Sequence, residues 1–218
     1  MPRIVLGVTG SVAAIRTPTL LEGLRNAGHD VRIVATEPAL HFFDLGDLPA
    51  DPLDPLGGPI FRDQDEWPER RWGRADPVLH IEMRRWADLL VVAPLDANSL
   101  AKFALGLSDN FLTCLFRAWD FNKPVILAPA MNTLMWDSPV TRRHLRLLLD
   151  DHGDGGPDTP WSVLDAASIF ARHSKTLQLV EPSSKRLACG DVGVGAMAEV
   201  ATILDAVRRL LDALPAAP

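Results

Sequence analysis

Cysteine is scarce in this sequence, with only Cys114 and Cys189 among 218 residues. Two cysteines form at most one bridge, which excludes a disulfide-rich secreted scaffold. No apolar run approaches the ~20 residues needed to cross a bilayer, and the chain starts with an expected strand where a signal peptide would lie. We therefore expect a cytoplasmic protein that has two free thiols and no membrane partner.

Clusters of basic residues are also missing. The chain has 22 Lys and Arg against 28 Asp and Glu, a net charge of -6, and its basic residues are scattered. Nucleic acid is therefore not an expected partner. The His and Cys positions show no paired ligand spacing, so no metal site is expected. The GxSxG and HExxH motifs are absent too.

The composition is that of an ordinary globular protein. Hydrophobic residues make up 47% of the chain and charged residues 23%, which supplies enough apolar surface for a real core. A length of 218 residues is short for two full domains. We expect one domain over residues 1–218.

Short apolar runs alternate with helical patterns along the chain. This alternation predicts an α/β fold, in which a mostly parallel sheet is covered by helices on both faces. Two segments rich in Pro, Gly and Asp, 44–74 and 150–175, interrupt the pattern and are expected to be long loops. The expected strands are 4–8, 31–35, 89–93, 125–128 and 177–180, and the expected helices are 12–28, 78–86, 100–107, 111–119, 140–149 and 198–214.

Small and polar residues follow the expected strands, and ligands of parallel α/β sheets bind at the carboxyl ends of the strands. Gly10 and Ser11 follow the first strand and could offer backbone N–H groups to a phosphate. A plain turn or a helix N-cap explains each of these residues equally well. The others are Thr36 after the second strand, Asp96, Ala97, Asn98 and Ser99 after the third, and the apolar loop with Ala130, Met131 and Asn132 after the fourth.

One histidine and one cysteine are candidates for chemistry. His80 opens a predicted helix, where a lone histidine is more often structural than catalytic. Cys189 is followed by glycines at 190, 193 and 195, which predicts a flexible loop with an accessible thiol. Cys114 is on the apolar face of a predicted helix and is expected to be inert.

Six short stretches together resemble the flavin-dependent cysteine decarboxylases. They are TGSVAA (9–14), DPVLHI (76–81), RRWAD (84–88), APLDAN (93–98), PAMN (129–132) and LACGD (187–191). The resemblance covers most of residues 3–212 in the same order. It implies a flavodoxin-like or Rossmann-like three-layer fold, FMN held at a subunit interface, and a homotrimer.

The resemblance also implies roles for individual residues. His80 falls where the family places a catalytic base, Asn132 where it grips the substrate carboxylate, and Cys189 where it places a proton donor. The positions that match the family's FMN contacts are Gly10, Ser11, Thr36, Asp96, Ala97, Asn98, Ser99 and Ala130. The nearest likeness within the family is to members that convert phosphopantothenoylcysteine to phosphopantetheine in coenzyme A biosynthesis.

Three further residues are candidates for binding the substrate. Arg16 and Arg85 could hold its phosphate, although a solvated position on a helix explains each of them equally well. Met131 lies next to Asn132 and could contact the substrate.

Two other functions remain open. The family also includes enzymes that decarboxylate a C-terminal peptidyl cysteine, for which the segment 150–175 could be a peptide clamp and Cys189 would not be needed. Some relatives are non-catalytic regulators, but they carry long acidic extensions that this chain lacks. The segment 150–175 is longer than in typical members, and 51–58 is a smaller insertion; both could change how the substrate is covered.

Overall fold

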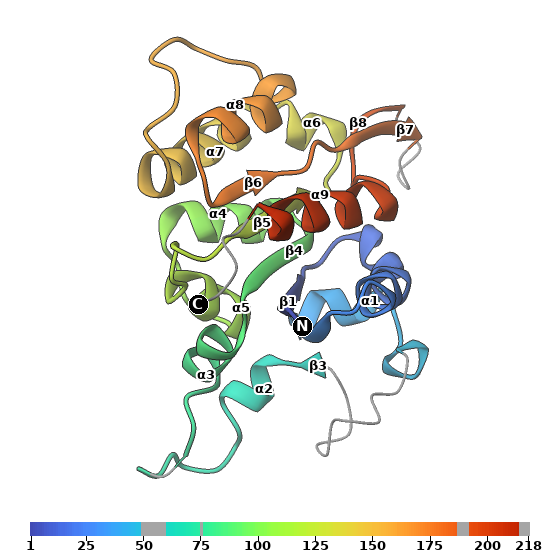
Figure 1. The fold of residues 1–218 in the computed structure, drawn as a ribbon, viewed down its shortest axis with the longest axis vertical. Coiled ribbons are helices and arrows are strands. Elements are labelled where there is room, and N and C mark those ends of the chain that lie inside the picture. Colours follow the sequence, from blue (N-terminus) through green and yellow to red (C-terminus); the bar gives the residue numbers. More distant parts are fainter. Residues whose placement is uncertain (49–59, 75, 187–191, 214–218) are drawn as a thin grey trace.

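The computed structural model describes residues 1–48, 60–74, 76–186 and 192–213. Its central sheet has six parallel strands in the order β3-β2-β1-β4-β5-β6 (Figure 1). The chain adds strands outward from β1 in one direction and then from β4 in the other, so the carboxyl ends of β1 and β4 flank the point where the order reverses. The strands are β1 (Arg3–Val8), β2 (Asp30–Ala35), β3 (Ile60–Phe61), β4 (Leu89–Leu95), β5 (Val125–Pro129) and β6 (Leu177–Leu179).

Helices cover both faces of this sheet (Figure 1). One face carries α1 (Thr17–Asn26) and α9 (Val200–Asp212). The other face carries α3 (Leu79–Trp86), α4 (Ala97–Leu105), α5 (Phe111–Arg117), α7 (Pro139–His152) and α8 (Ala166–His173). The short elements are α2 (Asp63–Glu66), α6 (Thr133–Trp136) and the 3₁₀ turns η1 (Val12–Arg16), η2 (Glu37–His41), η3 (Leu45–Asp47) and η4 (Val163–Asp165). Within the described ranges no helix is both long and apolar enough to span a bilayer.

The strands are apolar on both faces because each face is buried against helices. In β1, Ile4 and Leu6 belong to the core shared with α1 and α9, whereas Val5 belongs to the core on the opposite face. All three side chains are fully buried. The expected flavodoxin-like three-layer α/β fold is therefore confirmed.

The first helix begins later than its apolar pattern suggests. Residues 12–16 form the 3₁₀ turn η1, and the α-helix starts at Thr17 with Pro18 in its first turn. Proline is favoured in the first turn of a helix because it has no N–H to donate and its φ already suits a helix. After the helix ends, Gly28 adopts a φ of +86°, a conformation that glycine reaches at little cost.

The two segments expected to be loops contain regular structure. Strand β3 and helix α2 lie within 44–74, and helix α8 lies within 150–175. Helix α8 was missed because Pro, Gly and Asp dominate the residues before it. Its side chains Ile169 and Phe170 nevertheless complete the core that also holds α7.

The glycine-rich stretch near the C-terminus was also predicted incorrectly where the structure describes it. Strands β7 (Ser183–Arg186) and β8 (Val192–Ala196) pair antiparallel. A Cβ atom on Gly193 would lie 2.7 Å from Thr133 Cγ2. A Cβ on Gly195 would overlap the carbonyl oxygen of Met131. These glycines allow close packing instead of providing a flexible loop.

Replacing Phe170 by alanine should test whether α8 is an integral part of the fold. The ring is fully buried, so Phe170→Ala should lower the free energy of unfolding by about 3–5 kcal/mol. Leu164, just before α8, is 54% exposed, and Leu164→Ala should change it by less than about 0.5 kcal/mol. Urea denaturation measures both values. Equal effects of the two substitutions would contradict the packing of α8.

Candidate active site

A buried threonine joins the loops that follow β1 and β4. The Thr9 hydroxyl donates to the carbonyl oxygen of Pro94 at 2.8 Å and accepts from the Asp96 backbone N–H at 2.7 Å. Thr9 is fully buried, so these bonds are not exchanged with water. They hold the two loops together where the strand order reverses, which is where parallel α/β sheets bind ligands.

Gly10 lies where three loops meet. A Cβ atom built on Gly10 would lie 2.6 Å from Pro38 Cβ and 3.5 Å from Asp96 Oδ2. Thr36, at the start of the loop after β2, is buried, and its backbone N–H donates to Val8 O at 3.0 Å. Only glycine leaves space for a ligand to approach the backbone at this point.

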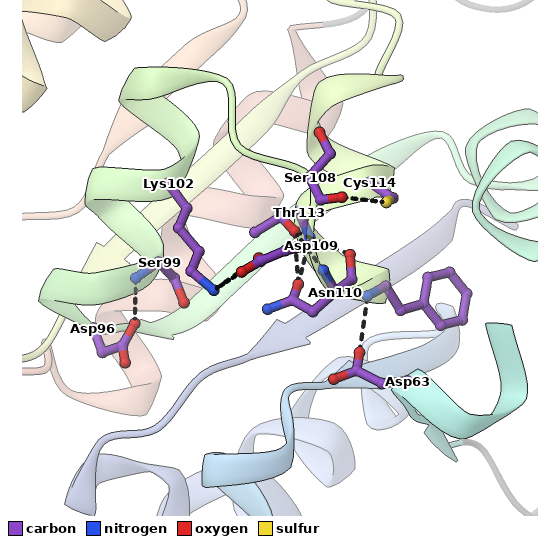
Figure 2. Close-up of polar contacts among 10 residues, drawn as sticks. Asp63, Asp96, Ser99, Lys102, Ser108, Asp109, Asn110, Thr113 and Cys114 are labelled. Atoms are coloured by element: carbon purple, nitrogen blue, oxygen red, sulfur yellow. Dashed lines mark hydrogen bonds and ion pairs between the residues drawn. The ribbon is translucent and has the colours of Figure 1, made fainter. Parts of the chain in front are cut away.

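Asp96 begins helix α4, and Figure 2 shows its carboxylate next to the Ser99 backbone. Asp96 Oδ1 accepts the Ser99 N–H at 2.8 Å, so Asp96 is the N-cap of α4. Ala97, Asn98 and Ser99 form the first turn of this helix, in which Asn98 is exposed and Ser99 is buried. The N-cap interpretation of Asp96 is thus correct, and the exposed start of α4 still faces the Gly10 loop through Asp96 Oδ2.

The loop after β5 connects to β4 and to the β7–β8 hairpin. The Ala130 N–H donates to Leu95 O at 2.9 Å, and the Met131 N–H donates to Gly195 O at 2.8 Å. Met131 is only 9% exposed and belongs to the core, so its side chain packs inside the protein. Asn132 Oδ1 accepts the Leu134 N–H at 2.8 Å and caps α6.

His80 is the second residue of α3 and is held by a glutamate that the sequence did not reveal. His80 Nδ1 lies 2.6 Å from Glu66 Oε1, and the His80 backbone N–H donates to Glu66 Oε2 at 2.9 Å. The Glu66 side chain is only 5% exposed. Glu66 lies in a segment predicted to be a loop, where a carboxylate reads as a solvated surface group.

Helix α2, which carries Glu66, is fixed to the start of α5. Figure 2 shows the Asp63 carboxylate directed at this helix end, where Asp63 Oδ1 accepts the Phe111 N–H at 2.8 Å. Burial raises the pKa of Asp63, and the nearby carboxylates of Glu37 and Asp109 raise it further, while the Phe111 hydrogen bond opposes both effects. The contact therefore forms at a real desolvation cost.

The remaining candidates differ in how far the structure describes them. Arg16 and Arg85 are exposed, and neither side chain forms a hydrogen bond or ion pair with the described part of the chain. Arg85 follows His80 by five residues, which is about 140° around the helix, so the two do not share one face of α3. Cys189 lies outside the described residues.

Cys114 behaves as a structural thiol. It is partly buried on α5, and its Sγ donates to Ser108 O at 3.4 Å. Burial raises the pKa of the Cys114 thiol, and the carboxylates of Glu66, Asp109 and Asp63 raise it further. A thiol with a raised pKa holds less thiolate and is less reactive.

Comparison with known proteins identifies the family. The Flavoprotein family model matches residues 1–212. A phosphopantothenoylcysteine decarboxylase of Arabidopsis thaliana is 46% identical over 208 residues, which cover 95% of this chain and 84% of that protein. The chain belongs to the phosphopantothenoylcysteine decarboxylase family of flavin-dependent cysteine decarboxylases.

Two solved structures of this family share the fold closely. One is a phosphopantothenoylcysteine decarboxylase mutant, with serine in place of a cysteine, complexed with pantothenoylaminoethenethiol. It has a TM-score of 0.78 and 43% identity, and the match covers 97% of this chain and 99% of that chain. The other is the FMN binding protein AtHal3, with a TM-score of 0.75, 44% identity and 98% of both chains covered.

The cramped space around Gly10 should make cofactor binding sensitive to a single methyl group. Gly10→Ala should weaken FMN binding at least about tenfold, because the added Cβ must displace Pro38 or block the approach to the backbone. Gly46→Ala is the matched control, since nothing lies within 4 Å of a Cβ at that position. Fluorescence titration of the apoprotein with FMN measures both affinities. Equal affinities in the two variants would remove Gly10 from the FMN site.

Proposed function

We propose that this protein catalyses the FMN-dependent decarboxylation of phosphopantothenoylcysteine to phosphopantetheine, a step of coenzyme A biosynthesis. The observation that carries the proposal is the likeness over nearly the whole chain to a decarboxylase complexed with pantothenoylaminoethenethiol. The relatives' shared activity extends to this chain because His80, Asn132 and Cys189 are all present in it.

The residues around Gly10 fit FMN. A glycine cradle, backbone N–H groups and the exposed N-terminal end of α4 suit a phosphate and a flat ring system. FMN, when bound, supplies the oxidation of the substrate thiol and the later return of the two electrons. The residues assigned to hold it are Gly10, Ser11, Thr36, Asp96, Ala97, Asn98, Ser99 and Ala130.

The chemistry explains why a thiol must be oxidised before CO₂ is lost. Decarboxylation of a cysteine carboxylate would leave a carbanion with no group to accept its electrons. Once the thiol is a thioaldehyde, the C=S group β to the carboxylate accepts the electron pair of the breaking C–C bond, and an enethiol results. His80 takes up a proton during the thiol oxidation.

Asn132 is suited to holding the substrate carboxylate. Its Oδ1 accepts the Leu134 N–H, so the amide nitrogen is the end that donates to a carboxylate. A neutral amide orients the carboxylate without stabilising its charge strongly. An arginine would stabilise the ground-state charge that must disappear as CO₂ leaves.

Cys189 is assigned the last proton transfer. Gly193, four residues after it, packs on Thr133 next to Asn132, so the β7–β8 hairpin lies beside the loop that would hold the carboxylate. Reduction of the enethiol to a saturated aminothiol needs one proton at carbon. The Cys189 thiol is the donor in this proposal.

The peptidyl-cysteine alternative loses its structural support. For that alternative, the segment 150–175 could have served as a peptide clamp. Trp161, Val163, Ile169 and Phe170 of this segment instead pack into the core. Arg16 and Arg85 remain candidates for the substrate phosphate, as exposed cations, whereas burial of the Met131 side chain argues against a direct substrate contact.

Cys189→Ser should separate the two halves of the reaction. Serine is nearly isosteric with cysteine but is a far weaker acid than a thiol of pKa ~8.5. The variant should therefore oxidise and decarboxylate phosphopantothenoylcysteine, then stall with bleached flavin absorbance and a product two hydrogen masses lighter than phosphopantetheine. Absorbance spectra and mass spectrometry provide the readouts.

The wild-type protein is the control in this experiment and should form saturated phosphopantetheine without consuming oxygen. Should the wild type release the enethiol and consume oxygen, with Cys189→Ser behaving identically, coenzyme A biosynthesis would be the wrong assignment. A peptide ending in cysteine, tested in parallel, should not be turned over.

The proposed assembly is a homotrimer in the cytoplasm, with FMN at the subunit interface. Apolar side chains next to site residues support self-association: Ile15 is 55% exposed and follows the Gly10 loop, and Leu134 is 80% exposed and follows Asn132. Leaving such side chains in water is unfavourable, and a second copy of the chain would cover them. The cytoplasmic assignment rests on the sequence alone.

Charging the exposed apolar surface should disrupt this assembly. Leu134→Asp should shift the protein from trimer to monomer and reduce its FMN content, because a carboxylate is costly to bury at an interface. Leu164→Asp, at a 54% exposed position on η4, should leave both properties unchanged. Light scattering gives the mass and absorbance gives the FMN content. A monomeric variant with full FMN and activity would refute the proposed interface.

A further inference from the structure

We propose that Glu66 is a positioning residue that fixes the tautomer of His80, so that Nε2 is the ring nitrogen able to take a proton. This inference rests on the proposed function for the role of His80. It adds a residue that no feature of the sequence had indicated, in a segment expected to be a loop.

The two carboxylate oxygens of Glu66 have different partners. Oε2 accepts the His80 backbone N–H at 2.9 Å, and Oε1 lies 2.6 Å from His80 Nδ1. A carboxylate can only accept, so in the neutral imidazole the hydrogen must be on Nδ1. The lone pair is then on Nε2, on the opposite side of the ring from Glu66.

The glutamate is itself held in place. Its side chain is 5% exposed, whereas the His80 side chain is 21% exposed, so the carboxylate is the more buried partner and the ring is the one that reaches the surface. Helix α2 is tied to α5 by the Phe111 N–H, which donates to Asp63 Oδ1. Within α2, the Arg62 N–H donates to Asp65 Oδ2 at 2.7 Å and closes the first turn. Glu66 is thus a fixed reference for the ring orientation.

The substitution Glu66→Gln should give His80 the opposite tautomer. The backbone N–H of His80 requires an acceptor, and in Glu66→Gln only the amide oxygen can accept. The amide NH₂ group then faces Nδ1 and donates to it. The hydrogen of the neutral ring moves to Nε2, which can no longer accept a proton from the substrate.

The wild-type tautomer can be measured directly. Long-range ¹H–¹⁵N correlation spectra of the FMN-loaded protein, labelled at histidine, distinguish Nδ1–H, Nε2–H and doubly protonated rings. A spectrum recorded in mildly alkaline buffer should show His80 as the Nδ1–H tautomer. His80→Gln identifies the resonance. An Nε2–H or doubly protonated His80 would overturn the proposal, even if no variant of Glu66 folds.

Glu66→Gln then tests the consequence, with Glu82→Gln as a matched control. Glu82 is exposed on α3, the helix that carries His80, so its substitution removes one carboxylate charge near His80 and leaves the Glu66 contact in place. In Glu66→Gln the tautomer should reverse, and flavin reduction by substrate in a single turnover should slow by about 10²–10⁴-fold. KM, FMN content and melting temperature should stay close to wild type, and Glu82→Gln should match wild type throughout.

The outcomes separate this inference from the proposed function. A wild-type protein that shows the Nδ1–H tautomer but does not decarboxylate phosphopantothenoylcysteine would refute the function and leave the tautomer assignment standing. An active wild type whose Glu66→Gln variant keeps the Nδ1–H tautomer or the full rate of flavin reduction would refute the inference alone. If KM rises in Glu66→Gln but flavin reduction in a single turnover is not slower, the inference is also refuted, and the role of Glu66 is structural only.

Discussion

The hydroxyl group of Thr9 connects the two strands between which the order of the sheet reverses. It donates to the carbonyl oxygen of Pro94, near the end of β4, and accepts from the backbone N–H of Asp96, the N-cap of α4. The position of Gly10 against Asp96 depends on this link, and so does the start of α4. The proposed FMN site is therefore built from backbone atoms that the sheet holds in register, with few side chains that must be ordered separately.

The proposed reaction needs groups from three other parts of the chain, and the structure positions two of them in different ways. His80 is oriented by a buried carboxylate on a neighbouring helix. Asn132 is oriented by its own role as a helix N-cap. Each of these two arrangements uses one local constraint to set the direction of a side chain. Strand β8, which follows Cys189 in the sequence, has glycines that let it pack closely against the loop after β5.

The elements that could be predicted from the sequence are those whose buried apolar residues recur at regular spacing. Except for β3 and α8, the strands of the central sheet and the helices that cover it were recognisable because their apolar residues recur with the spacing that burial on a sheet requires. Residues Gly10, Asp96 and Asn132 were recognisable because parallel strands bring their carboxyl ends to one edge. Helix α8 was missed because its buried side chains follow a long stretch of turn-forming residues.

Glu66 and the β7–β8 hairpin were missed for a different reason. The contact between Glu66 and His80 spans fourteen positions and joins two short helices, so no local pattern encodes it. Glycine is needed at positions 193 and 195 because atoms of Thr133 and Met131 lie where a Cβ atom would be. These contacts exist only in the folded chain. From composition, both segments were predicted to be loops.

Helix α2 has only four residues, and polar contacts at Asp63 and Glu66 anchor it. Little apolar surface holds so short an element, so it can open at a lower free energy than the sheet and its two cores. Heating would then release His80 from its carboxylate while the rest of the molecule stays folded. Loss of catalysis and loss of structure would occur at different temperatures, and tolerance of activity to heat would be governed by α2 instead of by the hydrophobic core.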